Sequence, residues 1–432
     1  MERRKLNEIE YLLLTFGQPN NISMCITIKG ELDFEKLRNA LDLAQEKHPM
    51  LKAQLIVEDE QQFLIWGDIN PIPLHMIPRK NKELYREIIE QEFITPFEMG
   101  LNCKNPLIRV KVLQSETVFD LIITIQHVIA DGMSMAFLFR DILEFYINPQ
   151  KKFKPFEIVK ETENILPLDI QKNIPKSKYR FKIVSWVTKI GVLLYRLIDN
   201  FKSESKEHNH LEFENINNQT LKTYSWIFNK QQTMDFIKKC KEQQISVQSA
   251  LCTMFLEDFP IINNPINLRN RLNYPVGEAV GLYASGLNIK KPYNPKISFW
   301  KNAEQYYNKL RKNLRSDKVF GIFKMISRAV PIESLIKFRP IFLELASRNN
   351  PFTITNLGAL DRLNLLISSE NLFIDHLYGG VSMSFEALVI TVFTIKNKMH
   401  FHFHYFSPPH TEKEIKNYVE KALKKLNIAL EN

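Results

Sequence analysis

The sequence predicts an α/β protein with mixed sheets, divided into two domains. With 432 residues, the chain is longer than one ordinary hydrophobic core can organise, so each half has room for a core of its own. Segments of alternating, β-branched residues are interleaved with segments of helical period along both halves. We place one domain at residues 1–150 and the other at 216–432, with a crossover linker over 151–215.

The first domain is predicted to begin with a strand, a helix and a second strand. The β-branched run 24–29 is typical of a strand, and Asp33 caps the helix that follows it, up to residue 47. Pro49 ends this helix before the strand predicted over 51–57. The rest of this domain is predicted as a helix over 82–93, strands over 107–112 and 118–125, and a helix from Ser134 onward.

The second domain is predicted to alternate helices and strands in the same way. Its helices are expected over 231–243, 246–259 and 411–429. Its strands are expected over 265–268, 282–289, 353–356, 389–395 and 399–406, the last by its strict alternation. The two halves therefore share a mixed α/β character.

The linker contains one segment of helical period. Apolar residues recur at helical spacing over 183–201 and are flanked by lysines and arginines. The segment is too short and too charged to span a bilayer, which needs about 20 mostly apolar residues. We expect a basic amphipathic helix packed on its own protein, with peripheral contact to a membrane surface as the alternative.

Net charge and cysteine content limit which partners and which cellular compartment are expected. The net charge of +10 favours anionic partners, among them nucleic acid, membranes, phosphorylated cofactors and acidic carrier proteins. The four cysteines lie far apart, which indicates isolated buried thiols in a reducing compartment. Glu8 and Glu10 interrupt the apolar run at the N-terminus, so we expect no secretory signal and a cytoplasmic location.

The strongest chemical signal is the segment QHVIADG over 126–132, at the end of the predicted strand 118–125. A histidine fixed at a strand end, with a pKa near neutrality, is suited to take a proton from a hydroxyl or an amine. Asp131 is expected to point away from His127 and to need a buried cationic partner, while Gly132 permits the tight backbone. Dinucleotide, phosphate-loop, zinc-protease and nucleophile-elbow motifs do not occur in the sequence.

This His-x-x-x-Asp-Gly pattern resembles the active-site signature of the superfamily of condensation domains and chloramphenicol-acetyltransferase-like acyltransferases. Further segments also resemble that superfamily: GELD at 30–33 leading to KHPMLK at 47–52, NLRNRL at 267–272, VGLY at 280–283 and TNLG at 355–358. The resemblance covers nearly the whole chain. It implies two chloramphenicol-acetyltransferase-like domains with an active-site tunnel at their interface, entered by an acyl thioester and by its acceptor from opposite sides.

The resemblance also assigns roles. His127 would be the general base that deprotonates the acceptor and later protonates the leaving thiolate. Asp131 would be structural and paired with an arginine of the second domain, Arg269 in first place and Arg271 in second. Gly132 belongs to the same motif.

Two departures from the family pattern narrow the expected reaction. Condensation domains that act on carrier proteins usually have a histidine before the catalytic one, whereas this chain has Gln126, which favours ester formation over amide formation. The segment at 355–358 stands in place of the Asp-Phe-Gly-Trp-Gly of plant enzymes and is similar to alcohol O-acyltransferases and to phthiocerol dimycocerosyl transferase-like, polyketide-associated acyltransferases. Asn356 and Gln126 are weaker candidates for contacting substrate or an oxyanion.

We therefore expect an acyltransferase that transfers groups other than aminoacyl groups. The donor would be acyl-coenzyme A or an acyl carrier protein, and the acceptor a small-molecule alcohol, within polyketide or lipid biosynthesis or other secondary metabolism. The thioester is a co-substrate, and no bound cofactor or metal is expected. The alternatives are an amide-forming enzyme that uses carrier-bound substrates and an inactive docking module of the same fold.

A rival site is the row His400, His402 and His404, which projects from one face of a predicted strand, at about 6–7 Å per step. Neutral imidazoles can bind zinc, but no carboxylate or cysteine lies within this run. Nucleic-acid binding is not expected, because the basic residues are scattered or lie in the linker, without a stacking motif.

Overall fold

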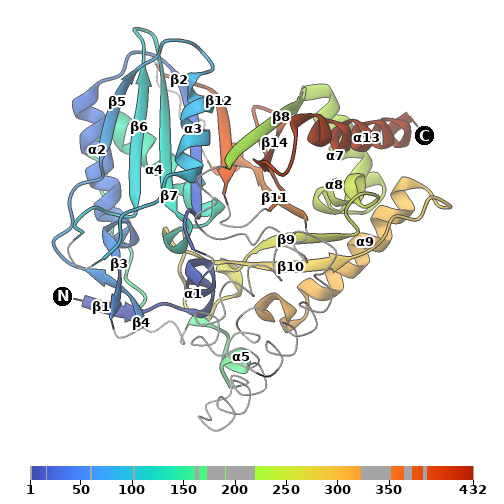
Figure 1. Cartoon of the computed structure of the whole chain (residues 1–432), viewed down its shortest axis with the longest axis horizontal. Helices are drawn as coiled ribbons and strands as arrows, with labels where there is room; N and C mark the ends of the chain where they lie inside the picture. Colours follow the sequence, from blue (N-terminus) through green and yellow to red (C-terminus); the bar gives the residue numbers. More distant parts are fainter. Residues whose placement is uncertain are drawn as a thin grey trace, which may run out of the picture.

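The computed structural model shows two lobes side by side (Figure 1) and describes residues 2–15, 17–58, 61–100, 103–160, 165–172, 190, 219–321, 323, 352–363, 372–382 and 387–431. The predicted amphipathic segment 183–201 lies outside the described residues, apart from Ile190. Within the described ranges, no helix has the length and apolar character that a membrane crossing requires.

The first lobe is built on a five-stranded sheet in the order β12-β2-β7-β6-β5, in which only β5 and β6 pair in parallel. Its strands are β2 (Asn21–Lys29), β5 (Leu74–Pro78), β6 (Ile108–Gln114), β7 (Val118–Gln126) and β12 (Phe373–Val381). Helices α2 (Phe34–Lys47) and α4 (Gly132–Ile147) pack against each other and share the first hydrophobic core with this sheet. The helix α3 (Leu84–Ile94) contacts β2 and also the second lobe.

Smaller elements complete the N-terminal part of the chain. A three-stranded sheet has the order β1-β4-β3, and the short helix α1 contacts the turn that follows β7. The elements are β1 (Glu2–Lys5), α1 (Glu8–Thr15), a 3₁₀ turn η1 (Pro49–Lys52), β3 (Ala53–Glu58), β4 (Gln61–Trp66) and α5 (Leu168–Lys172).

The second lobe is built on a six-stranded sheet in the order β10-β9-β11-β13-β14-β8, which mixes parallel and antiparallel pairs. Its strands are β8 (Thr220–Phe228), β9 (Ile261–Asn267), β10 (Ala284–Lys290), β11 (Phe352–Ala359), β13 (Val389–Ile395) and β14 (Lys398–Ser407). The second core lies between this sheet and the helices α7 (Lys230–Glu242), α8 (Val247–Phe255), α9 (Phe299–Leu314) and α13 (Glu412–Glu431). Short 3₁₀ turns are η6 (Arg269–Arg271), η7 (Asp317–Phe320) and η8 (Leu360–Leu363).

One strand crosses between the lobes. The strand β12 comes from the segment predicted as the second domain but pairs with β2 of the first sheet, with Val381 opposite Ile22. The turn after β12 adds a further bond, because the Ser382 N–H donates to the Asn21 carbonyl at 2.8 Å. The first sheet is thus completed by residues from the far end of the chain (Figure 1).

The predicted α/β class with mixed sheets is confirmed, and the strand over 389–395 is found with the predicted bounds. The strand predicted over 265–268 is wrong in position, since β9 begins at Ile261. Among the described residues, β9 pairs with β11 at Ile262 and Asn263, so Pro265 lies beyond the part of the strand that this pairing uses. Among the described helices and strands, those that we did not predict are β1, α1, β4, β5, α5, β8, α9 and β12.

Candidate active site

His127 lies on a 3₁₀ turn, η2 (His127–Ile129), between the end of β7 and the start of α4. Its imidazole Nδ1 is 2.8 Å from the carbonyl oxygen of Ala130. Because a carbonyl can only accept, Nδ1 carries the proton, and Nε2 of the neutral ring is left with a free lone pair. Its backbone N–H donates to the Asn20 carbonyl at 2.7 Å, which ties the turn to the start of β2.

Burial governs the electrostatics of His127. Loss of contact with water disfavours the imidazolium and lowers the pKa of His127 below its ordinary value, while the Ala130 carbonyl and the Asp131 carboxylate oppose this shift. The neutral, proton-accepting form is therefore favoured at neutral pH. An imidazole with a fixed tautomer and an unprotonated Nε2 has the properties of a general base.

The carboxylate of Asp131 points away from His127 and is held by four donors. Oδ1 accepts from the N–H of Ser134 at 2.8 Å and from its hydroxyl at 3.0 Å. Oδ2 accepts from Arg269 Nη1 at 2.8 Å and from the Tyr283 N–H at 2.9 Å. Burial alone raises the pKa of Asp131, but the Arg269 guanidinium and the donated hydrogen bonds outweigh it and hold that pKa below its usual value.

Arg269 and Ser134 extend this contact across the lobe interface. Arg269, on η6 of the second lobe, also donates from Nη2 to the Ser134 hydroxyl at 2.8 Å. The same hydroxyl accepts from the Gly281 N–H at 3.1 Å. The Arg269 guanidinium lies over the ring of Tyr283, 4.9 Å from its centroid. Arg271 is exposed and donates elsewhere, to the Leu314 carbonyl.

Gly132 begins α4 and lies next to Leu357 of β11. A Cβ at Gly132 would stand 2.8 Å from Cδ2 of Leu357, so the absence of a side chain lets the segment 355–358 pack on the motif. Asn356 uses its Oδ1 to accept from the Gly358 N–H at 2.9 Å, where Gly358 has φ +76°. The hydrogen bond of Asn356 thus shapes the β11 end next to the motif.

Gln126 is fully buried, and its side chain caps the turn that carries His127. Its Oε1 accepts from the N–H of Val128, which caps η2 at its first residues. The side-chain oxygen of Gln126 is therefore occupied by a backbone hydrogen bond.

A second buried cluster joins the lobes beside the Asp131 cluster. It is centred on His48, which directly follows the helix predicted up to residue 47. His48 Nδ1 accepts from the Val280 N–H at 3.2 Å, so Nε2 carries the proton and donates to Asp141 at 2.8 Å. Lys47 and Arg140 also contact Asp141, at 2.7 and 2.8 Å. The loop around residue 280 is thus fastened to the first lobe through His48 as well as through Asp131. Ser134 and Tyr283, which bind Asp131, were not predicted, because neither carries a distinctive spacing.

The row His400, His402 and His404 lies buried at the lobe junction. The rings of His400 and His402 are stacked with their centroids 6.5 Å apart, and Phe393 stacks on both. His402 and His404 receive or donate hydrogen bonds at Nδ1 with Ser225 and Thr223. In the part of the chain that the structure describes, no three His, Cys, Asp or Glu side chains converge as a metal site would need.

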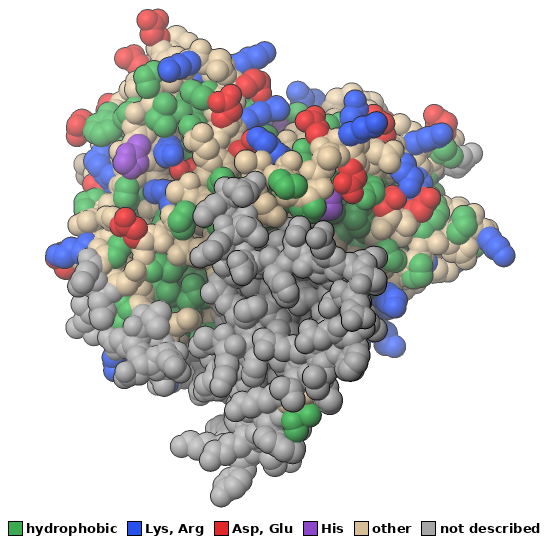
Figure 2. Space-filling view, in the orientation of Figure 1, with side chains coloured by type: hydrophobic (Ala, Val, Ile, Leu, Met, Phe, Trp, Pro, Cys, Tyr) green, Lys and Arg blue, Asp and Glu red, His purple; other side chains and the backbone are tan. Residues whose placement is uncertain are grey.

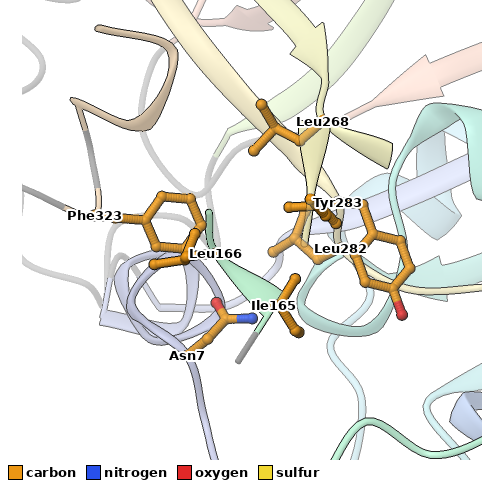
Figure 3. Close-up of a pocket in the computed structure, with 8 residues that line it drawn as sticks. Asn7, Ile165, Leu166, Leu268, Leu282, Tyr283 and Phe323 are labelled. Atoms are coloured by element: carbon orange, nitrogen blue, oxygen red, sulfur yellow. The ribbon is translucent and has the colours of Figure 1, made fainter. Parts of the chain in front are cut away.

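Figure 3 shows a mainly apolar pocket, and His127 is not among the residues that line it. The lining residues are Asn7, Ile165, Leu166, Leu268, Leu272, Leu282, Tyr283 and Phe323. The backbone N–H of Tyr283 also holds Asp131. The tunnel that the resemblance implies stays a prediction. On the face drawn in Figure 2, basic and acidic side chains of the described residues are interspersed over both lobes.

Comparison with known proteins supports the resemblance on two levels. Residues 12–160 match the family model of the condensation domain. Surfactin synthase subunit 2 of Bacillus subtilis is 27% identical over 157 residues, 34% of this chain and 4% of that protein. Tyrocidine synthase 3 of Brevibacillus parabrevis is 29% identical over 140 residues, 32% of this chain and 2% of that protein. The chain thus spans only a few per cent of the length of these relatives.

Solved structures match over the whole chain. The first condensation domain of the calcium-dependent antibiotic synthetase has a TM-score of 0.68 at 12% identity, with 100% of this chain and 97% of that chain covered. The trichothecene 15-O-acetyltransferase TRI3 of Fusarium sporotrichioides has a TM-score of 0.67 at 13% identity, over 99% and 95%. Polyketide synthase associated protein 5 of Mycobacterium tuberculosis has a TM-score of 0.62 at 17% identity, over 99% and 97%. The resemblance to the superfamily of condensation domains and chloramphenicol-acetyltransferase-like acyltransferases is therefore confirmed, with residues 12–160 matching its family model and both lobes having its fold.

Proposed function

We propose that this protein transfers an acyl group from a thioester donor to a hydroxyl acceptor, with His127 as the general base. The observation that carries this proposal is the Nδ1 hydrogen bond to Ala130, which leaves Nε2 of a neutral imidazole free to accept a proton. The donor is an acyl-coenzyme A or an acyl carrier protein, and the acceptor a small-molecule alcohol. The acyl group is not an aminoacyl group.

In the proposed reaction, a single imidazole nitrogen accepts the proton and later returns it. His127 Nε2 takes the hydroxyl proton as the acceptor oxygen attacks the thioester carbonyl carbon. The tetrahedral intermediate then breaks its carbon–sulfur bond, and the imidazolium returns the proton to the leaving thiolate. The products are an ester and a free thiol, and the protein forms no covalent intermediate. Asp131 acts structurally, since its carboxylate is engaged by Arg269 and by backbone donors.

Amide formation on carrier-bound substrates is the second candidate. It is favoured by the condensation-domain match at residues 12–160 and by the similarity to surfactin synthase subunit 2 and tyrocidine synthase 3, whereas ester formation is favoured by Gln126. The full-length likenesses include a condensation domain and an O-acetyltransferase alike, so they do not separate the two candidates. The location in the cytoplasm, the peripheral membrane contact through 183–201 and the absence of nucleic-acid partners stay predictions.

The test is a thiol-release assay with matched panels. Purified full-length protein is incubated with acyl-coenzyme A thioesters of different chain length and with alcohols or amines, and free thiol and products are measured. We expect thiol release with alcohols, and a loss of at least about 100-fold in H127A, which removes the base. The circular dichroism spectrum of H127A should match that of the wild type. Equal turnover in H127A would disprove the role of His127, and amide products alone would favour the second candidate.

A further inference from the structure

The turn that carries His127 is held at its start by the side chain of the preceding residue. The Gln126 side chain is fully buried, and its Oε1 accepts from the N–H of Val128. The first N–H groups of a helical turn have no acceptor within the turn, so a side-chain acceptor here stabilises it. We propose that Gln126 is a positioning residue that sets the tautomer and the direction of the His127 imidazole.

The connection from Gln126 to the imidazole runs through this turn. At its far end, the Ala130 N–H donates to the His127 carbonyl at 3.4 Å, and the Ala130 carbonyl accepts from Nδ1 at 2.8 Å. The imidazole is therefore oriented by the same turn that Gln126 caps. Loosening the turn at Val128 moves the Ala130 carbonyl relative to the ring and weakens the bond that keeps the proton on Nδ1.

A complementary amide faces Gln126 on the neighbouring strand. Asn21 of β2 lies directly opposite Gln126 of β7, and both residues are fully buried. Their backbone N–H groups donate outward, to Ser382 and to Leu107, so the two residues form the kind of pair in which opposite side chains lie closest.

The free amide atoms of this pair match each other in chemistry. Among the described residues, Nε2 of Gln126 and Oδ1 of Asn21 have no hydrogen-bond partner. One is a donor and the other an acceptor, and one hydrogen bond, direct or through a single water, satisfies both. Asn21 is itself fixed, since its Nδ2 donates to the carbonyls of Glu92 and Thr95 at 2.8 and 2.7 Å. A hydrogen bond to this fixed neighbour would anchor the capping side chain.

The inference rests on the proposed function only in its kinetic part, so the test has a spectroscopic arm as well. The full-length protein is labelled with ¹⁵N-histidine, and the imidazole ¹⁵N shifts report which ring nitrogen carries the proton. The H127N variant identifies the His127 signals by their loss. Q126M removes the acceptor at similar volume, and Q126E keeps an oxygen at the same place. Q45M is the matched control, because Gln45 is also a buried glutamine but bonds to Leu51 and Asn70, away from the turn.

We expect His127 to carry its proton on Nδ1 in the wild type and in Q126E, and to be a mixture of tautomers in Q126M. The kcat for thiol release should fall about 10-fold in Q126M while KM changes less than about 2-fold, because orientation rather than binding is lost. Q45M should change neither. A single Nδ1–H tautomer in Q126M, or an equal change in Q45M, would overturn the proposal.

Two further outcomes of this experiment can be told apart. If Q126M does not fold, Q126L replaces it, since leucine also lacks a side-chain acceptor for the Val128 N–H, and it should give the same mixture of tautomers. An unchanged tautomer in Q126L would then overturn the proposal. If the tautomer shifts in Q126M while the wild type releases no thiol from any donor, the role of Gln126 stands and the proposed function fails.

Discussion

The carboxylate of Asp131 and the guanidinium of Arg269 meet at 2.8 Å across the lobe interface, and both side chains are almost completely buried. The removal of one partner from a buried pair leaves the other charge without compensation, which costs about 3–5 kcal/mol. We expect D131N to lower the free energy of unfolding by about this amount, as measured by urea denaturation. D131N/R269M should recover part of the loss. The control is D68N, since the Lys104–Asp68 pair is exposed, and an equal loss in D68N would contradict this explanation.

The contact between Gly132 and Leu357 predicts a strict requirement for glycine. G132A brings a methyl group to within 2.8 Å of the Leu357 side chain and should destabilise the protein by about 1–3 kcal/mol. L357A in the same chain should relieve the clash, so that the two substitutions are non-additive in urea unfolding. G321A is a control with open space around its Cβ position. Additive losses would show that the clash is absent.

The buried histidine row predicts loss of stability on mild acidification. Burial lowers the pKa of His400 to about 4 and that of His404 to about 3, whereas the unfolded chain has ordinary histidine pKa values near 6.5. The unfolded state therefore binds more protons below about pH 6.5, and the free energy of unfolding falls as the pH falls toward 4. Between pH 7 and pH 5, most carboxylates stay ionised, so this window isolates the histidines.

The measurement is urea unfolding at pH 7 and at pH 5 for the wild type and for H404N. H404N removes one of the low-pKa groups and should lose less stability between the two pH values than the wild type does. The rings of His404 and Phe93 lie edge to face at 5.2 Å, so H404N should also be less stable at pH 7. A pH dependence that is the same in both proteins would contradict the assignment to this row.

The stacking of His400 and His402 predicts that zinc is not bound in stoichiometric amount. Ring centroids 6.5 Å apart with nearly parallel planes do not direct two nitrogens at one ion. We expect elemental analysis of the purified protein to give well under one zinc per chain, and chelation to leave thiol release unchanged. One equivalent of zinc together with loss of activity on chelation would restore the metal site as a candidate.

The sequence was sufficient for much of the fold because local patterns determine it. The strand 389–395 is mostly apolar and β-branched and is buried except at Thr394, and the helix from Asp33 has a cap and an apolar face that are visible in the sequence. The strand β12 was missed because an aspartate and two glycines, which are depleted in strands, interrupt its sequence FIDHLYGGV. Its pairing with β2 decides its structure. The helix α9 had a readable apolar spacing at Trp300, Ala303, Tyr306 and Leu310 that we did not use.

The residues of the candidate site were likewise predictable only in part. The motif identified His127 and its surroundings, since strand, turn and helix start are local features. The roles of Ser134 and Asn21 were not predicted, because Ser134 meets Arg269 and Asn21 lies opposite Gln126 at sequence separations of about 100 residues or more. Tyr283 belongs to the VGLY segment noted in the sequence, but its backbone bond to Asp131 depends on the packing of the two lobes. Such contacts are set by packing and leave no periodic signal.

The pairing of β12 with β2 has a consequence for how the protein can be made. Asn21 and Ser382 are 361 positions apart, so the edge of β2 stays open during synthesis until almost the whole chain has been produced. An open strand edge invites pairing with other chains. A fragment confined to residues 12–160, where the family model matches, would carry this edge permanently, and we expect it to aggregate unless residues 373–382 are supplied as a separate peptide.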